Sequence, residues 1–377
     1  MEKKSNNQVT KKQHMVAEVV QKQFSYDGLK TYGVKEIHIL DENKKCKRIN
    51  YDINSFSISN IMWFDSCYEL PTYCRTNQNT NLLENRFAEI ENVYLDILEK
   101  IKNMIEQKYS FKELDNYIKD IALCYFLIFY FRTKMILFYG NSMKGTDKQQ
   151  DVILKRLNHT LFDYEYITGL INTIKHCYKL SILESPSNSF LLSDSFISTA
   201  SIDYKGICLE TPFYLNRTIG LKNIIILIPI SGRYYLLFSD NKNYTKSNYM
   251  KIYDHEILKY NSVIYRNSFE FTVGRNMEAV RKVADKVNKY ALFGFAGGSV
   301  QKPEIWVDEG VDKKVYCVDV EQLKDQGVGF TKYVDKKGSF YTMEKSIQEL
   351  TNNIGIKLIS RNPNFTSNKG DNYVQQI

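Results

Sequence analysis

The stretch of sequence that decides the fold reads IALCYFLIFYFRTKMILFY, residues 121–139. Residues 121–131 are all apolar or aromatic, which predicts a buried helix, because a helix at the surface carries polar residues on its outer side. Arg132 interrupts the run before it reaches the ~20 residues that cross a membrane. A guanidinium stays charged at neutral pH, and burying it alone costs several kcal/mol. We therefore expect Arg132 to meet an acidic group of the protein or of a ligand.

Helices are predicted on both sides of this stretch. Ser110 and Glu113 form a capping-box pattern that begins the apolar helix. A third helical region is expected over about residues 149–183. Before the apolar helix, another helix is expected over about 81–108, because apolar residues recur there at helical spacing. The apolar helix shows the same spacing up to Arg132. These two stripes are Leu83, Phe87, Ile90, Tyr94, Ile97, Ile101 and Met104, and then Leu114, Ile118, Ile121, Tyr125 and Ile128.

Short runs of β-branched and aromatic residues predict strands on either side of the helices. The first pair is a hairpin, residues 34–40 and 46–51, joined by the polar loop 41–45. We expect further strands at 190–200, 206–213, 223–230, 233–239 and 262–273, a helix at 277–292, strands at 305–307 and 315–320, and a helix near 343–353.

The predicted fold class is α+β, with a helical layer packed against an antiparallel sheet and a smaller C-terminal α/β segment. The expected organisation is a mobile N-terminal arm at residues 1–12, an α+β domain at 13–275, and a C-terminal α/β extension with a polar tail at 276–377.

Composition narrows the kind of protein. The net charge of +8 favours an anionic partner such as nucleic acid or a nucleotide, although so small a surplus is also common in proteins that bind neither. The abundance of Lys, Asn, Ile, Tyr and Phe fits an AT-rich genome better than base-stacking surfaces. The seven Cys are scattered singly, without a disulfide or metal-ligand spacing. The N-terminus shows no secretory signal. We expect a cytoplasmic protein with no membrane segment.

Several short motifs, in this order along the chain, resemble a bacterial domain-of-unknown-function family, number four-two-three-eight. The resemblance covers about residues 11–275 and implies an α+β fold and a residue set, but no established activity; the family is suspected of defence or nuclease roles. The chain departs from the family pattern at Ala17, Phe129, Lys134 and Ser195–Phe196. The motifs are the opening His14–Phe24, the pair Glu84 and Glu91, Phe131–Thr133, Phe190–Asp194 and Ile228–Ser231.

The candidate catalytic residues are His14, Glu84, Glu91 and Asp194, and the candidate anion-binding residue is Arg132. Glu84 and Glu91 lie two helical turns apart, about 10 Å along the axis, so they cannot hold one ion without help. A neutral imidazole can act as a general base or metal ligand, and an Arg fork suits phosphate or carboxylate. Each residue also has a structural interpretation: a solvated helix edge for the glutamates, a solvated His14, a turn at Asp194 and an internal ion pair for Arg132.

Two functions are compatible with these residues. The first is a hydrolase, a nuclease or phosphodiesterase effector of a defence or toxin system, acting on nucleic acid or nucleotide, with a divalent metal as a candidate cofactor. The second is a non-catalytic sensor or binding module that recognises an anionic ligand or a partner protein. Convergence of the five candidate residues in one cleft would favour the first.

Overall fold

The structure is a computed structural model of the 377-residue chain. It describes residues 12–40, 46–65, 68–70, 81–133, 153–154, 157, 161, 164–203, 206–207 and 223–286, together with the C-terminal strands at 304–309, 314–319, 333–334, 340–341 and 357–358. Residues 1–11 of the arm expected at 1–12, the loop at 41–45 and the helix near 343–353 lie outside the described residues, whereas Lys12 begins strand β1 (Lys12–His14).

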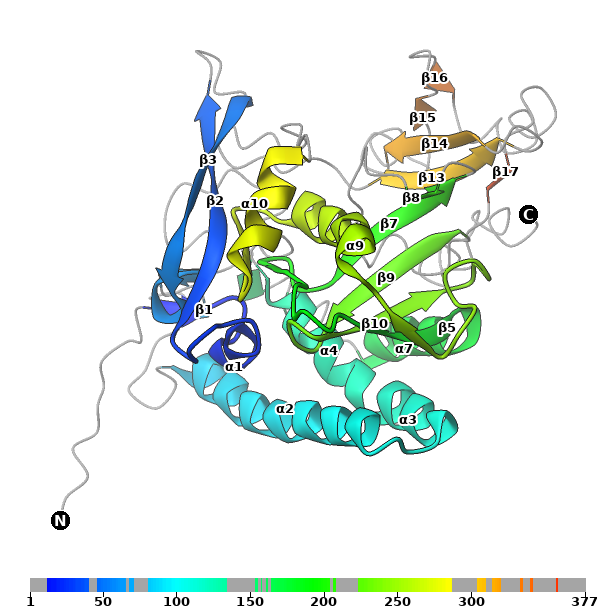
Figure 1. The fold of residues 1–377 in the computed structure, drawn as a ribbon, viewed down its shortest axis with the longest axis horizontal. Coiled ribbons are helices and arrows are strands. Elements are labelled where there is room, and N and C mark those ends of the chain that lie inside the picture. The colour runs from blue at the N-terminus through cyan, green and yellow to red at the C-terminus, as the bar shows by residue number, and fades with distance from the viewer. Residues whose placement is uncertain are drawn as a thin grey trace.

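The long helix predicted from the apolar stripe is α2, Leu82–Glu106. Its buried residues include Phe87, Tyr94, Ile97, Ile101 and Met104, so the predicted stripe is confirmed there. The next helix starts at the expected capping box, where Ser110 and Glu113 bond to each other's backbone. It consists of α3 (Phe111–Tyr117), the π-helical turn η3 (Ile118–Ala122) and α4 (Leu123–Phe131), which run continuously past the end of α2 (Figure 1).

The π-helical turn corrects the predicted register of this helix. Ile121 was expected in the core but is 46% exposed, whereas Ile118, Ala122 and Phe126 are fully buried. A π turn holds one more residue than an α turn, so the buried face shifts by one position after Ile118. Arg132 is the C-cap of α4 rather than a residue in the middle of a helix.

A four-stranded sheet holds the predicted N-terminal hairpin. Strand β2 (Lys30–Leu40) pairs antiparallel with β3 (Cys46–Ser57), which confirms the hairpin. The sheet order is β3-β2-β12-β6, where β12 is Phe271–Gly274 and β6 is Leu192–Ser193. Helix α10 (Met277–Lys286) packs against β2 and β12. The strands expected between residues 190 and 273, which the predicted fold class combines in one antiparallel sheet, are therefore divided between two sheets.

The second sheet has six strands in the order β11-β5-β10-β9-β7-β8. Every residue of β9 and β10 is buried, as expected for strands covered on both faces. All pairs are antiparallel except β11 with β5. The strands are β5 (Lys179–Glu184), β7 (Ser198–Asp203), β8 (Gly206–Ile207), β9 (Ile224–Pro229), β10 (Tyr234–Ser239) and β11 (Tyr249–Lys251).

For two further segments the predicted type of secondary structure is wrong. The helical region expected up to residue 183 ends with α7 (Tyr164–Cys177), and 179–184 form β5 instead. Residues 262–267 were expected to start a strand but belong to helix α9 (Asp254–Asn267). In both places tertiary contacts override local propensity: β5 lies between β10 and β11, and α9 packs against β7, β6 and α10.

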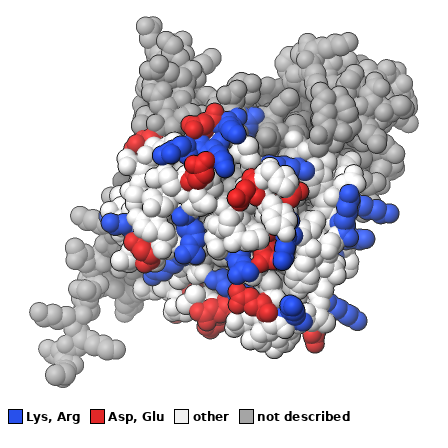
Figure 2. Space-filling model, in the orientation of Figure 1, with Lys and Arg blue, Asp and Glu red and all other residues white. Residues whose placement is uncertain are grey.

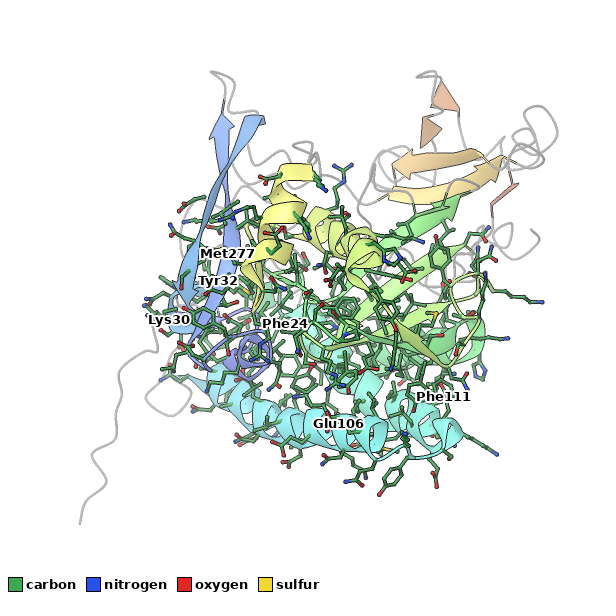
Figure 3. The ribbon with its side chains drawn as sticks, viewed as in Figure 1. Phe24, Lys30, Tyr32, Glu106, Phe111 and Met277 are labelled. Atoms are coloured by element: carbon green, nitrogen blue, oxygen red, sulfur yellow. The ribbon has the colours of Figure 1, made fainter. Side chains whose placement is uncertain are left out.

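The short helix α1 (Glu18–Lys22) lies beside α2 (Figure 1), and Gln23, just after it, accepts a hydrogen bond from Lys102 near the end of α2. Just after it, Phe24 is fully buried and packs edge-on against Tyr235 of β10, with 6.2 Å between ring centroids. Figure 3 shows Phe24 in the interior between the helices and the sheets. Strand β1 (Lys12–His14) pairs with β4 (Trp63–Asp65), and η1 (Ile58–Asn60) precedes β4.

The C-terminal strands form a separate five-stranded sheet in the order β16-β15-β14-β13-β17. The expected strands near 305 and 315 are confirmed as β13 (Glu304–Glu309) and β14 (Lys314–Asp319). The other strands are β15 (Tyr333–Val334), β16 (Phe340–Tyr341) and β17 (Lys357–Leu358). Within the described part of the chain, no helix combines the length and the hydropathy needed to cross a membrane.

Candidate functional site

Arg132 lies buried at the end of α4, where it meets α2 and the chain just before α1. Its side chain is 1% exposed. Nη1 donates to Glu91 Oε1 at 2.8 Å, and Nη2 donates to the backbone carbonyl of His14 at 2.5 Å. The expectation that this cation meets an acidic partner is confirmed. One of the two predicted glutamates, Glu91 on α2, supplies the carboxylate.

Aromatic rings enclose the guanidinium. Its central carbon lies 4.5 Å from the ring centroid of Phe87 and 5.5 Å from those of Tyr68 and Phe129. The Tyr68 hydroxyl donates to the Arg132 carbonyl at 3.0 Å. Burial disfavours the charged guanidinium, but Tyr68 and Glu91 outweigh it and raise the pKa of Arg132 above its ordinary value. The cation is thus permanent and held in one position.

His14 contributes more than its carbonyl to this cluster. Its Nε2 atom is buried and has no hydrogen-bond partner, with Glu18 Oε1 at 3.6 Å. Burial lowers the pKa of His14 below its usual value, against the opposing effects of Glu18 and a hydrogen bond with the backbone of Ile58. A lowered pKa favours the neutral imidazole, which carries a buried nitrogen without a hydrogen-bond partner.

Glu84 is the acidic residue of this cluster that corresponds to the basic His14. Its Oε2 atom is buried without a hydrogen-bond partner. Burial raises the pKa of Glu84, nearby Arg132 lowers it, and the charges of Glu91 and Glu69 raise it further. A raised pKa favours the protonated carboxylic acid, which can donate a proton.

The same cluster holds other polar atoms without partners. Buried atoms of this kind are uncommon in proteins and often mark a water, ligand or catalytic site. Glu69, which sequence reasoning missed, is 1% exposed and follows Tyr68 in a segment with no periodic pattern to reveal it. The unpartnered atoms are Gln13 Nε2, His14 Nε2, Glu69 Oε1, Glu84 Oε2 and Arg132 Nε. We call these five residues with Glu91 the acid–base cluster.

Asp194 plays a different part. Its Oδ1 accepts the backbone N–H of Phe269 at 2.6 Å, and its Oδ2 accepts those of Glu270 at 2.6 Å and Phe271 at 2.9 Å. Both carboxylate oxygens therefore fix the chain where it enters β12. The structure brings His14, Glu84, Glu91 and Arg132 together, and it gives Asp194 this structural task.

The described residues contain no group of three or more His, Cys, Asp and Glu side chains placed to hold a metal ion. Within the acid–base cluster, His14, Glu69, Glu84 and Glu91 are the side chains whose chemistry would suit a divalent cation.

The fold and the cluster define an α+β protein with a buried acid–base centre between α1, α2 and the end of α4. The chain belongs to the family described as protein of unknown function (DUF4238), whose model matches residues 12–278. The match confirms the resemblance drawn from the short motifs and covers all residues of the cluster. Neither the curated proteins nor the solved structures contain a match to this chain.

Proposed function

We propose that this chain is a phosphodiester hydrolase, a nuclease or phosphodiesterase, with His14 and Glu84 as its acid–base pair. The observation that supports this function is that both residues carry a buried polar atom without a partner, beside one fixed guanidinium. Their pKa values shift in opposite directions, toward a neutral base and a protonated acid. Such divergent environments are typical of catalytic acid–base pairs.

The proposed reaction needs one water molecule. His14 Nε2 takes a proton from the water as its oxygen forms a bond to phosphorus. The bond between phosphorus and the leaving oxygen breaks, and Glu84 gives its proton to that oxygen. The products are a phosphate monoester and an alcohol, with the imidazole protonated and Glu84 ionised; one proton returned between them through solvent resets the site.

Arg132 and Glu91 act here as positioning residues. Both terminal nitrogens of Arg132 donate inside the protein, so its role is to fix the His14 carbonyl and the Glu91 carboxylate. Only Nε lacks a partner and is available to a substrate oxygen that enters the cluster. The choice of a phosphodiester rests on this donor and on the net charge of +8. The cytoplasmic setting and a role in defence rest on the sequence expectations alone.

The test compares cleavage of bis(p-nitrophenyl) phosphate, RNA and single-stranded DNA, with and without divalent metal. We expect His14→Gln and Glu84→Gln to lose about 10²–10⁴-fold in rate, the usual contribution of a general acid or base, while both variants unfold cooperatively. The matched controls are His255→Gln and Glu99→Gln, both at exposed positions, which should keep the wild-type rate. Wild-type rates in His14→Gln and Glu84→Gln would reject the assignment.

The burial of the cluster favours a second candidate function, a non-catalytic binding module. The side chains of His14 and Glu91 are only 15% and 23% exposed, which suits a structural core better than a cleft for a polymer. This function predicts that no substrate is turned over under any metal condition, while a specific nucleotide or protein raises the melting temperature.

A further inference from the structure

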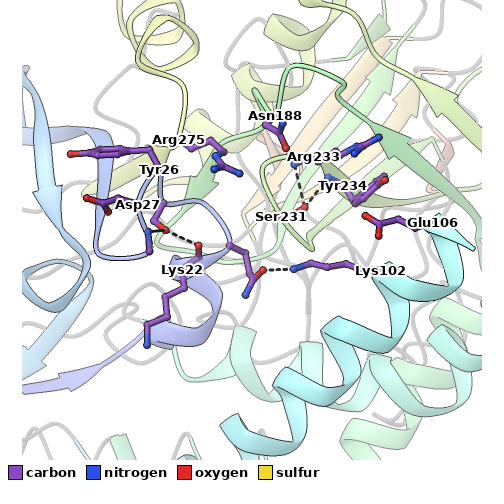
Figure 4. Close-up of a pocket in the computed structure, with 13 residues that line it drawn as sticks. Lys22, Tyr26, Asp27, Lys102, Glu106, Asn188, Ser231, Arg233, Tyr234 and Arg275 are labelled. Carbon is purple, nitrogen blue, oxygen red and sulfur yellow. Dashed lines mark hydrogen bonds between the residues drawn. The ribbon is translucent and has the colours of Figure 1, made fainter.

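A polar pocket lies apart from the acid–base cluster, at the far end of α1 and α2. Its volume is about 480 Å³, within the range of small-molecule sites. Its walls come from the turn after α1, the end of α2, the β9–β10 hairpin and the residue that follows β12 (Figure 4). Lys102 of α2 lies eleven positions beyond Glu91, about 16 Å along the helix. A ligand here would not touch His14 or Glu84.

The pocket carries more basic than acidic side chains. Its lining includes Lys22, Lys102, Arg233 and Arg275 but only two acids, Asp27 and Glu106. The Asp27 Oδ1 atom already accepts the backbone N–H groups of residues 29 and 30, at 2.8 and 2.6 Å. This lining leaves a net positive site for an anion.

Arg233 and Arg275 differ in whether a carboxylate of the protein balances their charge. Arg233 donates twice to Glu184 Oε1, at 3.1 and 2.6 Å, so its charge is already balanced. Arg275 makes no ion pair or side-chain hydrogen bond with any described residue, and its stem packs over Gly232. Figure 4 shows the Arg275 guanidinium beside the pocket, opposite Ser231. Arg275 is therefore a guanidinium fork that a ligand can engage.

Two further donors face the same space. The Ser231 hydroxyl oxygen accepts the backbone N–H groups of Arg233 and Tyr234, at 3.2 and 3.1 Å. Both bonds use the oxygen as acceptor, so its own proton is available to donate. Lys102 donates to the amide oxygen of Gln23 rather than to a carboxylate, and burial lowers its pKa. Glu99 and Glu106 oppose this lowering, and an anion in the pocket would stabilise the ammonium in the same way.

We infer that this pocket binds the phosphate group of a small phosphorylated molecule, with Arg275, Ser231 and Lys102 as its donors. A phosphate monoester carries about −1.5 to −2 charges and three acceptor oxygens, which matches two cations without a carboxylate partner and one free hydroxyl. A nucleic-acid strand fits less well, because it needs a continuous basic track. On the visible face, basic and acidic side chains alternate (Figure 2).

The experiment measures binding of inorganic phosphate, glucose 6-phosphate and adenosine monophosphate to the full chain by calorimetry and melting temperature. Glucose, adenosine and citrate are the unphosphorylated comparisons, and a short DNA duplex tests the polymer. We expect at least one phosphorylated probe to bind more tightly than its unphosphorylated partner and than the duplex. Preference for glucose 6-phosphate or for the nucleotide identifies the source of the phosphate group.

Arg275→Gln should weaken this binding at least about tenfold, the loss expected when a charge-assisted hydrogen bond is removed. Ser231→Ala should weaken it too. The control is Arg281→Gln, which removes the same charge from an exposed position of α10 outside the pocket and should bind like wild type. Equal losses in Arg275→Gln and Arg281→Gln, tighter binding of the duplex, or no phosphate-dependent binding would each overturn the inference. Changes in hydrolysis by His14→Gln have no bearing on it.

Discussion

The ion pair between Glu91 and Arg132 provides the sharpest test of how this fold is held together. Replacing Glu91 with Gln keeps its size and an oxygen acceptor but removes the charge that faces a guanidinium 1% exposed. Breaking a buried pair costs about 3–5 kcal/mol. Water reaches Glu91, whose side chain is 23% exposed, and the amide still accepts a bond. We therefore expect the free energy of unfolding to fall by about 2–3 kcal/mol.

That loss corresponds to a melting temperature about 4–12 °C lower, since a domain of this size loses about 2–4 °C per kcal/mol. The control is Glu89→Gln on the same helix. Glu89 pairs with Arg86 at 2.5 Å, but both side chains are more than half exposed, at 65% and 69%. Such surface pairs contribute about 0–1 kcal/mol. Equal destabilisation by Glu91→Gln and Glu89→Gln, measured by calorimetry and urea unfolding, would refute a desolvated, charge-dependent pair.

Three more changes test other parts of the structure. Asp194→Ala should cost at least about 3 kcal/mol in urea unfolding, because three backbone N–H groups lose a charged acceptor; a cost below that of Asp194→Asn would contradict this role. His14→Gln should flatten the pH dependence of stability. The pKa of His14 is lowered by burial, so the unfolded chain takes up a proton first and wild-type stability falls as the pH drops below about 6.5; an unchanged slope in the variant would exclude this. Deleting Ile121 should turn η3 into a regular α-turn and lower the melting temperature by only a few degrees. Deleting Glu99 from α2 instead rotates the rest of that helix by about 100° and should abolish cooperative unfolding. Similar outcomes for the two deletions would argue against the π turn.

Periodic patterns in the sequence predicted the elements whose stability comes from their own residues. The stripe from Phe87 to Met104 predicted α2, and the capping box at Ser110 predicted the start of α3. The alternating residues of 34–40 and 46–51 predicted the β2–β3 hairpin. In each case one buried face or one local hydrogen-bond pattern is sufficient to define the element.

Prediction from the sequence was wrong where long-range contacts determine the secondary structure. Residues 262–267 are rich in β-formers but complete α9, whose Asn261 and Asn267 bond to the chain about seventy positions away. Likewise, 179–184 form a strand because β10 and β11 lie on either side. No local pattern reports such neighbours. Glu69 was missed for the same reason, since only the folded chain brings it near Glu84.

The candidate site was predicted in part because burying a charge leaves a signature in a single sequence. An arginine next to a long apolar run needs a partner, and Glu91 is that partner. Asp194 has no comparable signature. A carboxylate that ends a strand and one that serves a catalytic site look the same in sequence, and only the fold shows that Asp194 accepts the backbone N–H groups of 269–271.

The π-helical turn connects the fold to this site. One extra residue in η3 rotates everything after it by about 100° relative to a regular helix. A regular helix would place Arg132 on the same face as Leu114 and Ile118, which are fully buried. The rotation turns Arg132 away from that face, and it meets Glu91 and the His14 carbonyl instead. Single π turns inside α-helices are rare and are often found at functional sites, and this one, which ends ten residues before Arg132, sets the direction in which the cation points.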